Sequence, residues 1–205
     1  MEAQAFAIDG ERTARVTRTT KETDIQIAID LDGAGRTRID TGVPFFDHML
    51  DAFGRHGLID LDVRAVGDLA VDAHHTVEDT GIVLGQAVAQ ALGDKRGIVR
   101  YGSIALPMDE TLILAAIDIS GRGQAHLELE PPIELLGNFN TTLADEFFIA
   151  LAANARTTLH LRQLAGKNSH HIIEAASKAC ARAFKQAVAI DPRVAGELPS
   201  TKGSL

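Results

Sequence analysis

The sequence predicts an α+β fold built from two similar halves, each of them a small sheet covered by two helices in an α/β two-layer sandwich. Hydrophobic residues recur first with the two-residue period of strands and then with the 3.6-residue period of helices. A His-His-x-x-Glu motif occurs once in each half, at 74–78 and 170–174. Because no Gly/Ser-rich or Pro-rich linker separates the halves, which we place at 1–93 and 94–205, we expect pseudo-symmetric units packed as one body.

The first half contains three predicted strands and two predicted helices. The strands are expected over 24–32, 36–41 and 59–65, where the first and third alternate hydrophobic and polar residues. A helix over 44–57 is indicated by a proline at its start and by apolar residues at i, i+3, i+4 and i+7. The first His-His-x-x-Glu motif then opens a second helix, which ends at Gly93.

The second half repeats this order of elements. We expect four strands, at 103–106, 112–120, 124–130 and 158–164, and two helices, one at 143–156 and one that the second motif opens and that continues to Val188. Neither half is large enough to bury a substantial core alone, so the repeat predicts an internal duplication rather than two independent domains.

Composition limits the possible functions. The formal net charge of −8 argues against a nucleic-acid partner, although a few convergent Lys and Arg residues could still bind one small phosphate. The single cysteine, Cys180, excludes an intramolecular disulfide framework. The N-terminus lacks a basic segment followed by an apolar run, and no apolar stretch reaches membrane-spanning length. We therefore expect a cytoplasmic protein without a membrane partner.

The repeated motif predicts metal binding. On a helix the Glu lies about 40° from the first His and about 60° from the second, while the two His diverge by about 100°. Such a pair suits two ions better than one, which predicts a pair of metal sites assembled from parts of both motifs. A single His-His pair is more often a helix cap or a surface feature, and the repetition is what favours ligands. Histidine with carboxylate suits manganese, iron, zinc or cobalt.

Five ordered motifs carry a resemblance to a known family. They are FFDHML at 45–50, HHTVED at 74–79, PMDE at 107–110, KNSHHIIE at 167–174 and PSTKG at 199–203. Together they resemble the imidazoleglycerol-phosphate dehydratases over nearly the whole chain, from about Ala14 onward. The resemblance implies dehydration of imidazole glycerol phosphate, a small phosphorylated imidazole, to imidazole acetol phosphate in histidine biosynthesis. It also implies two manganese ions per active site and a homo-oligomer of 24 subunits, built from trimers, with active sites between subunits.

The same resemblance implies a set of metal ligands. One position departs from the family pattern, because Glu146 stands where most members have a histidine. A carboxylate oxygen can bind manganese directly, which we expect here. Alternatively, Glu146 lies behind the ligands and leaves one ion short of a ligand or with a water. The implied ligands are His48, His74, His75, Glu78, His170, His171 and Glu174, with Glu146 as the eighth.

The catalytic and substrate-binding residues also come from the resemblance. The resemblance implies that Glu22 is the general acid/base and that Asp109 is a possible helper. Glu78 and Glu174 are the other implied catalytic residues. Unaided, the sequence would assign Glu22 to a solvated surface and the C-terminal tail to a frayed end. His126 and His160 match no ligand position and are expected to be structural. The implied substrate-binding residues are Glu22, His48, Arg55, His56, His74, Glu78, Arg100, Arg122, His170, Lys178, Ser200, Thr201 and Lys202.

Two other classes of function fit a pair of metal sites. A dinuclear metallohydrolase would also use two ions to activate water, but the chain has no His-Glu-x-x-His motif. A metal-storage or metal-sensing oligomer would favour more carboxylates and would not need a phosphate clamp. The cationic residues at 100, 122, 178 and 202 therefore speak against storage.

Overall fold

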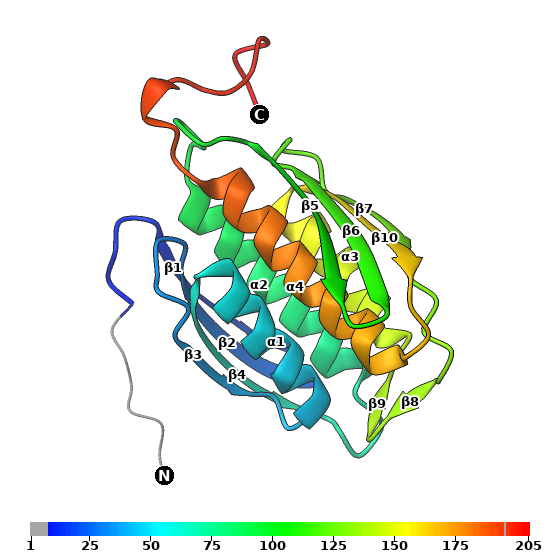
Figure 1. The fold of residues 1–205 in the computed structure, drawn as a ribbon. Helices are drawn as coiled ribbons and strands as arrows, with labels where there is room; N and C mark the ends of the chain where they lie inside the picture. The colour runs from blue at the N-terminus through cyan, green and yellow to red at the C-terminus, as the bar shows by residue number, and fades with distance from the viewer. Residues whose placement is uncertain (1–7, 195) are drawn as a thin grey trace.

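Four helices lie between two sheets in the computed structural model, which describes residues 8–194 and 196–205 (Figure 1). The first sheet has the strand order β1-β2-β4-β3, in which β3 and β4 run parallel and the other neighbours are antiparallel. Its strands are β1 (Thr13–Thr19), β2 (Thr23–Asp30), β3 (Thr37–Asp40) and β4 (Asp60–Gly67).

The second sheet repeats this topology. Its order is β5-β6-β10-β7, and again only the last two neighbours, β10 and β7, are parallel. The α+β class and the duplicated architecture are thus confirmed. The strands are β5 (Tyr101–Met108), β6 (Thr111–Asp118), β7 (Gln124–Glu128) and β10 (Thr158–Ala165), and a short hairpin is formed by β8 (Leu135–Leu136) and β9 (Phe139–Asn140).

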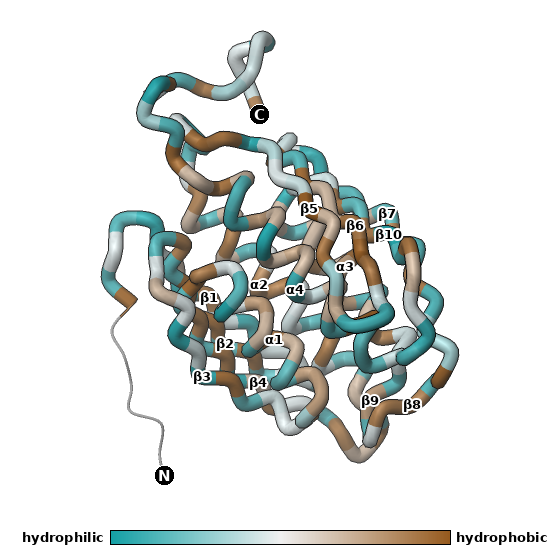
Figure 2. The backbone as a smooth tube through the Cα atoms, in the orientation of Figure 1, coloured by the Kyte–Doolittle hydropathy of each residue, from teal (hydrophilic) through white to brown (hydrophobic). Residues whose placement is uncertain are grey.

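The helices bury the inner faces of both sheets. They are α1 (Pro44–Gly57), α2 (His74–Leu92), α3 (Leu143–Ala155) and α4 (Ser169–Val188), followed by the 3-10 helix η1 (Pro192–Val194). Helix α2 packs on α3 and on the first sheet, while α4 packs on α1 and on the second sheet. Figure 2 shows the hydrophobic segments mainly along strands and helices, with mostly hydrophilic connecting loops. No helix in the described part of the chain is long and apolar enough to cross a membrane.

The structure extends the predicted elements at two places. Strand β1 falls in a segment that the sequence predicts to be a polar start, because Ala14 is the one buried residue along it. Its backbone pairs with β2 over the whole strand, so an edge strand forms without a strong hydrophobic signal. The β8–β9 hairpin was not predicted either, since it is only a few residues long.

Candidate metal centre and active site

Both His-His-x-x-Glu motifs open helices, as the sequence predicted. At the start of α4, the side chain of Asn168 accepts hydrogen bonds from the backbone N–H groups of His170 and His171, at 2.9 and 3.4 Å. Ahead of α2, the Asp72 carboxylate accepts from the His74 N–H at 2.8 Å. These contacts satisfy backbone groups that the helix itself leaves unpaired, and they fix where each motif begins.

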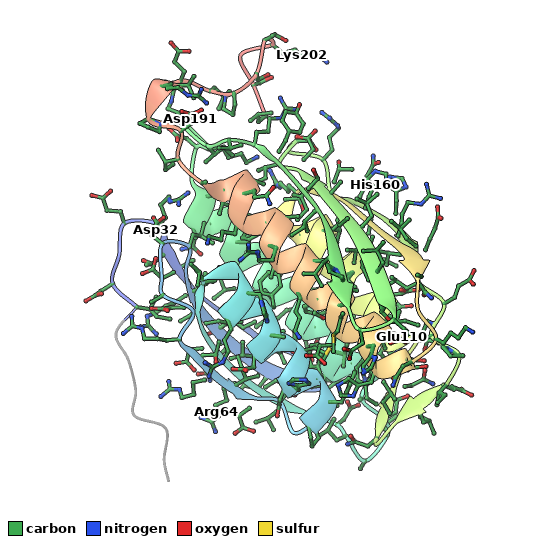
Figure 3. The ribbon with its side chains drawn as sticks, in the orientation of Figure 1. Asp32, Arg64, Glu110, His160, Asp191 and Lys202 are labelled. Carbon is green, nitrogen blue, oxygen red and sulfur yellow. The ribbon has the colours of Figure 1, made fainter. Side chains whose placement is uncertain are left out.

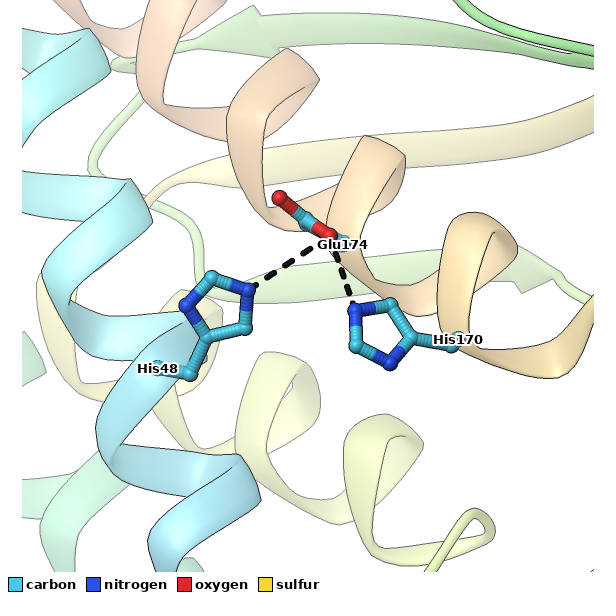
Figure 4. A group of neighbouring side chains, drawn as sticks. All are labelled: His48, His170 and Glu174. Atoms are coloured by element: carbon cyan, nitrogen blue, oxygen red, sulfur yellow. Dashed lines mark hydrogen bonds and ion pairs between the residues drawn. The ribbon is translucent and has the colours of Figure 1, made fainter.

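One group of side chains is arranged to hold a metal ion. His48 from α1 meets His170 and Glu174 from α4, and their ligand atoms lie within 4.8 Å of one another (Figure 4). Glu174 Oε2 is 3.0 Å from His170 Nε2 and 3.5 Å from His48 Nε2. Two imidazole nitrogens and one carboxylate oxygen are a donor set that divalent transition metals accept. The predicted ligands at 48, 170 and 174 are therefore brought together within one chain.

Glu174 is held in its ionised form. It is only 7 % exposed, and this burial raises its pKa. Lys178, one helical turn further on, has its ammonium 2.6 Å from Glu174 Oε1. Together with smaller contributions from His48 and His170 it outweighs the effect of burial, so the pKa of Glu174 lies below its ordinary value. The carboxylate thus keeps one oxygen on Lys178 and turns the other toward the two imidazoles.

The second His of each motif is oriented by a carboxylate that is not among the residues predicted from the sequence. His171 Nδ1 lies 2.8 Å from Glu110 Oε2, and His75 Nδ1 lies 3.0 Å from Asp68 Oδ2. Because an ionised carboxylate only accepts hydrogen bonds, each Nδ1 carries a proton, and in the neutral ring each Nε2 is then left with its lone pair. Neither pairing is indicated by the sequence. Glu110 is 61 residues away from His171 along the chain, and Asp68 is separated from His75 by a loop.

Glu110 lies in the turn between β5 and β6. Its Oε1 accepts the backbone N–H groups of Lys167 and Asn168 at 3.1 and 3.0 Å. Hydrogen bonds from His171 and from these two N–H groups lower the pKa of Glu110 to about 2, while Glu110 raises the pKa of His171. The neighbouring Asp109, the expected catalytic helper, has an oxygen 3.8 Å from His171 Nε2.

The first motif forms a less complete group than the second. His74 Nε2 lies 3.8 Å from Glu78 Oε2, and within the described residues no third donor joins them. Glu146 is in the first turn of α3, and the structure gives its side chain no hydrogen bond or ion pair in the described part of the chain. Helix α2 packs on α3 with Gly81 against Phe147. Glu146, which precedes Phe147, therefore lies beside the first turns of α2.

Glu22 lies in the turn between β1 and β2, the position in the first half that corresponds to the Glu110 turn in the second. Its backbone N–H donates to Thr20 Oγ1 at 3.0 Å, and its side chain is exposed. The pKa of His75 is raised chiefly by the Asp68 hydrogen bond, with a smaller contribution from the charge of Glu22. The expected general acid/base therefore stands near the first motif.

The expected phosphate-binding residues separate into two places. Arg100 pairs with Asp118 at 2.7 Å and donates to the carbonyl of Pro199 at 2.8 Å. In the tail, Ser200 Oγ accepts the Lys202 N–H at 3.2 Å, and Thr201 is exposed. Arg122 follows Gly121, whose backbone (φ +77) approaches Leu205 so closely that a Cβ there would lie 2.5 Å from the Leu205 carbonyl carbon. These residues gather where α4 ends.

Lys178 lies instead beside the metal-binding group, next to the last turn of α1. Partial desolvation and the positive charges of Lys178 and Arg182 lower the pKa of His56. Arg55 pairs with Asp51 on its own helix at 2.9 Å. His56 thus faces the same stretch of α4 as the metal-binding group, whereas Arg55 is held by its own helix. His126 and His160 stack on each other across β7 and β10, with ring centroids 4.4 Å apart.

The metal-binding group and the C-terminal tail lie at opposite ends of the chain's fold. His170 is in the first turn of α4, and the tail follows the last turn of this 20-residue helix. A helix of that length spans about 30 Å. Figure 3 shows Glu110, which contacts His171, and Lys202 far apart in the molecule. A small substrate cannot reach both places within one chain.

Fold and site together define a class: a duplicated α+β protein whose His and Glu residues at helix starts suit a divalent metal. The imidazoleglycerol-phosphate dehydratase family profile matches residues 41–184. Dehydratases of that name from Acidiphilium cryptum and Symbiobacterium thermophilum are 61% and 60% identical, over 95% of this chain and 99% and 93% of theirs. Solved structures of the Staphylococcus aureus and Pyrococcus furiosus dehydratases give TM-scores of 0.80 and 0.80 at 40% and 36% identity. They cover 87% and 93% of this chain, and 99% and 100% of their own chains.

The chain therefore belongs to the imidazoleglycerol-phosphate dehydratase family. Membership makes it a hydro-lyase of histidine biosynthesis that acts on a small molecule, and the resemblance drawn from its motifs is confirmed.

Proposed function

We propose that the protein removes water from imidazole glycerol phosphate to form imidazole acetol phosphate in a metal-dependent reaction. The observation that carries the proposal is the convergence of His48, His170 and Glu174, whose ligand atoms lie within 4.8 Å of one another. This donor set fits a divalent transition metal, and we propose two manganese ions per active site. The proposed ligands are His48, His74, His75, Glu78, Glu146, His170, His171 and Glu174.

The chain's own residues divide the work of the reaction. When bound, the ions would supply Lewis acidity and a template for the substrate. Asp68 and Glu110 hold the Nδ1 protons of His75 and His171 and so present each Nε2. Dehydration also requires loss of a weakly acidic C–H proton, which needs a positioned base. Glu22 fits this role, because its carboxylate is exposed and has no hydrogen-bond or ion-pair partner in the described structure.

The phosphate of the substrate needs cationic and hydroxyl groups. We propose that Arg100, Arg122, Ser200, Thr201 and Lys202 supply them from one chain, while Lys178 acts beside the metal-binding group. Guanidinium groups bind phosphate through two points and ammonium groups through one charge. The remaining proposed substrate contacts are Arg55, His56, His74, Glu78 and His170, together with His48. Asp109, near His171, is the proposed catalytic helper.

The separation of the two places supports active sites that are shared between copies of the chain. A substrate bound at His48, His170 and Glu174 cannot reach Lys202 of the same chain, so another copy has to supply the tail. We propose the 24-subunit assembly with active sites between subunits, located in the cytoplasm. Such an assembly also gives the incomplete first motif, with Glu146, a place to find further ligands.

Metal analysis combined with turnover tests this function. We expect the purified protein to form imidazole acetol phosphate from imidazole glycerol phosphate, to lose this activity on chelation, and to regain it when manganese is restored. Glu174→Ala should lose both metal and turnover, while Glu22→Gln should keep metal and substrate binding but lose most turnover. Tight metal binding without dehydration would contradict the proposal, and full metal content in Glu174→Ala would remove Glu174 from the ligands.

A further inference from the structure

Asp79 immediately follows Glu78 in the first motif and is 7% exposed. We propose that Asp79 is a positioning residue, which fixes the turn that carries Glu22 relative to the first motif. The inference rests on the proposed acid/base role of Glu22. It assigns a function to a motif residue that neither the metal ligands nor the substrate contacts include.

Asp79 contacts both strands of the β1–β2 hairpin, close to the turn that joins them. Its Oδ2 accepts a hydrogen bond from Thr23 Oγ1 and lies 2.5 Å from Arg18 Nη1. Thr23 is the first residue of β2, and Arg18 is the last but one of β1. Thr23 is 3% exposed, so this contact between α2 and the hairpin is buried. A buried charge of this kind is stable only while its partners stay in place, which makes the geometry well defined.

A short series of hydrogen bonds connects Thr23 to Glu22. The Thr23 and Thr20 hydroxyls are 3.2 Å apart, and Thr20 Oγ1 accepts the backbone N–H groups of Glu22 and Thr23 at 3.0 Å each. The Glu22 carboxylate itself has no hydrogen-bond or ion-pair partner among the described residues. Its position is therefore determined by the backbone of the turn, and the turn is anchored by Asp79.

The two halves anchor equivalent turns in opposite ways. In the second half, the turn supplies the carboxylate, Glu110, and the start of α4 supplies the donors at Lys167, Asn168 and His171. The residue after Glu174 is accordingly Ala175, which has no polar side chain. In the first half, the helix supplies the carboxylate and the hairpin supplies the donors. This exchange leaves the turn carboxylate, Glu22, free for chemistry.

Thr23→Val tests the anchor without removing the buried ion pair between Arg18 and Asp79. We expect turnover (kcat) to fall roughly ten- to a hundredfold, as small misplacements of catalytic groups do, with KM and manganese content unchanged. Thr23→Ser should restore the hydroxyl and most of kcat. Asp60→Asn is the control, because Asp60 is another buried carboxylate that pairs with an arginine. It is the first residue of β4, at the end of that strand away from Thr23. This control variant should lower the melting temperature while kcat, assayed well below that temperature, is kept.

Combining the substitutions separates positioning from general damage. If Asp79 and Thr23 act through Glu22, the double variant Thr23→Val, Glu22→Gln should be no slower than Glu22→Gln alone. A further fall by the factor seen for Thr23→Val alone would overturn the inference, as would unchanged kcat in Thr23→Val. Retained turnover in Glu22→Gln would instead refute the proposed role of Glu22, and this inference with it.

Discussion

At the scale of single residues, the carboxylates that contact the second histidine of each motif decide which of its ring nitrogens carries the proton and which is left to accept. Glu110 and Asp68 each accept from an Nδ1, and neither was selected from the sequence. Carboxylates in this position raise the basicity of the ligand and fix its orientation. Their contribution can be tested without disturbing the turn, because the two oxygens of Glu110 have different partners.

Glu110→Gln should weaken manganese binding about ten- to a hundredfold. The amide oxygen can still accept from Lys167 and Asn168, as Glu110 Oε1 does. The amide NH₂ would then face His171 Nδ1 and favour the tautomer with its proton on Nε2, which blocks that nitrogen. Titration with Mn²⁺ measures the change. Glu128→Gln, which disturbs only an exposed pair with Arg162, should leave the affinity unaltered, and equal affinities in both variants would contradict the tautomer argument.

Asp60 gives the fold a pH dependence that can be worked out in sign. Burial raises its pKa, but hydrogen bonds from the Arg36 side chain and from the backbone N–H groups of Arg36 and Ala34 outweigh this, so the pKa lies below 3.8. A lowered carboxylate pKa stabilises the folded state above the unfolded pKa, and that stability is lost as the pH falls through the folded value.

The melting temperature of wild type should therefore exceed that of Asp60→Asn at pH 7, with the difference narrowing as the pH falls below about 4. Asp94→Asn removes a carboxylate that is 73% exposed in its side chain and should match wild type at each pH. Thermal unfolding at a series of pH values measures all three proteins. A difference that stays constant down to acid pH would show that Asp60 acts through packing alone.

At the scale of elements, close helix packing depends on two glycines of α2. A Cβ on Gly85 would lie 2.7 Å from the Leu151 carbonyl oxygen and 2.8 Å from the Ala155 nitrogen. A Cβ on Gly81 would lie 2.8 Å from the Phe147 carbonyl oxygen. Contacts with backbone atoms cannot relax by a rotamer change, so the α2–α3 pair requires both glycines. This packing also fixes where Glu146, at the start of α3, lies along α2 relative to the first motif.

Gly85→Ala should destabilise the protein even though alanine favours helices. Overpacking costs roughly 1–3 kcal/mol, and the gain in helix propensity is about 1 kcal/mol. Urea unfolding should show a lower midpoint than wild type. Gln90→Ala, at an exposed position of the same helix, should leave the midpoint equal or slightly higher. A Gly85→Ala midpoint at or above that of wild type would show that α3 can move away from α2.

Elements with a strong local signal were predictable from the sequence, and long-range contacts were not. The helix over 44–57 and the helix starts at both motifs match the structure, because proline, apolar spacing and motif repetition are local features. Strand β1 has too few apolar residues to be recognised and depends on pairing with β2. The partners Asp79, Glu110 and Asp68 could not be chosen, since their contacts exist only once the hairpins lie against the helices.

At the scale of the whole molecule, Glu22 and Lys202 lie far apart, and this separation allows a test of whether one active site takes residues from two chains. The hairpin that carries Glu22 is tied to the first turns of α2, while Lys202 follows the end of α4. The variant Glu22→Gln damages the first place and Lys202→Ala damages the second, while all the proposed metal ligands stay intact in both. Both variants are therefore expected to assemble.

Co-expression of the two variants should restore turnover that neither shows alone. If each active site takes Glu22 from one chain and Lys202 from another, random mixing leaves about a quarter of the sites with both residues intact. If both residues come from one chain, every site keeps a damaged residue and no activity returns. The measurement is kcat of the co-expressed assembly, compared with that of each variant and with a mixture of separately purified variants. Turnover no higher than the mean of the two variants would refute sites shared in this way.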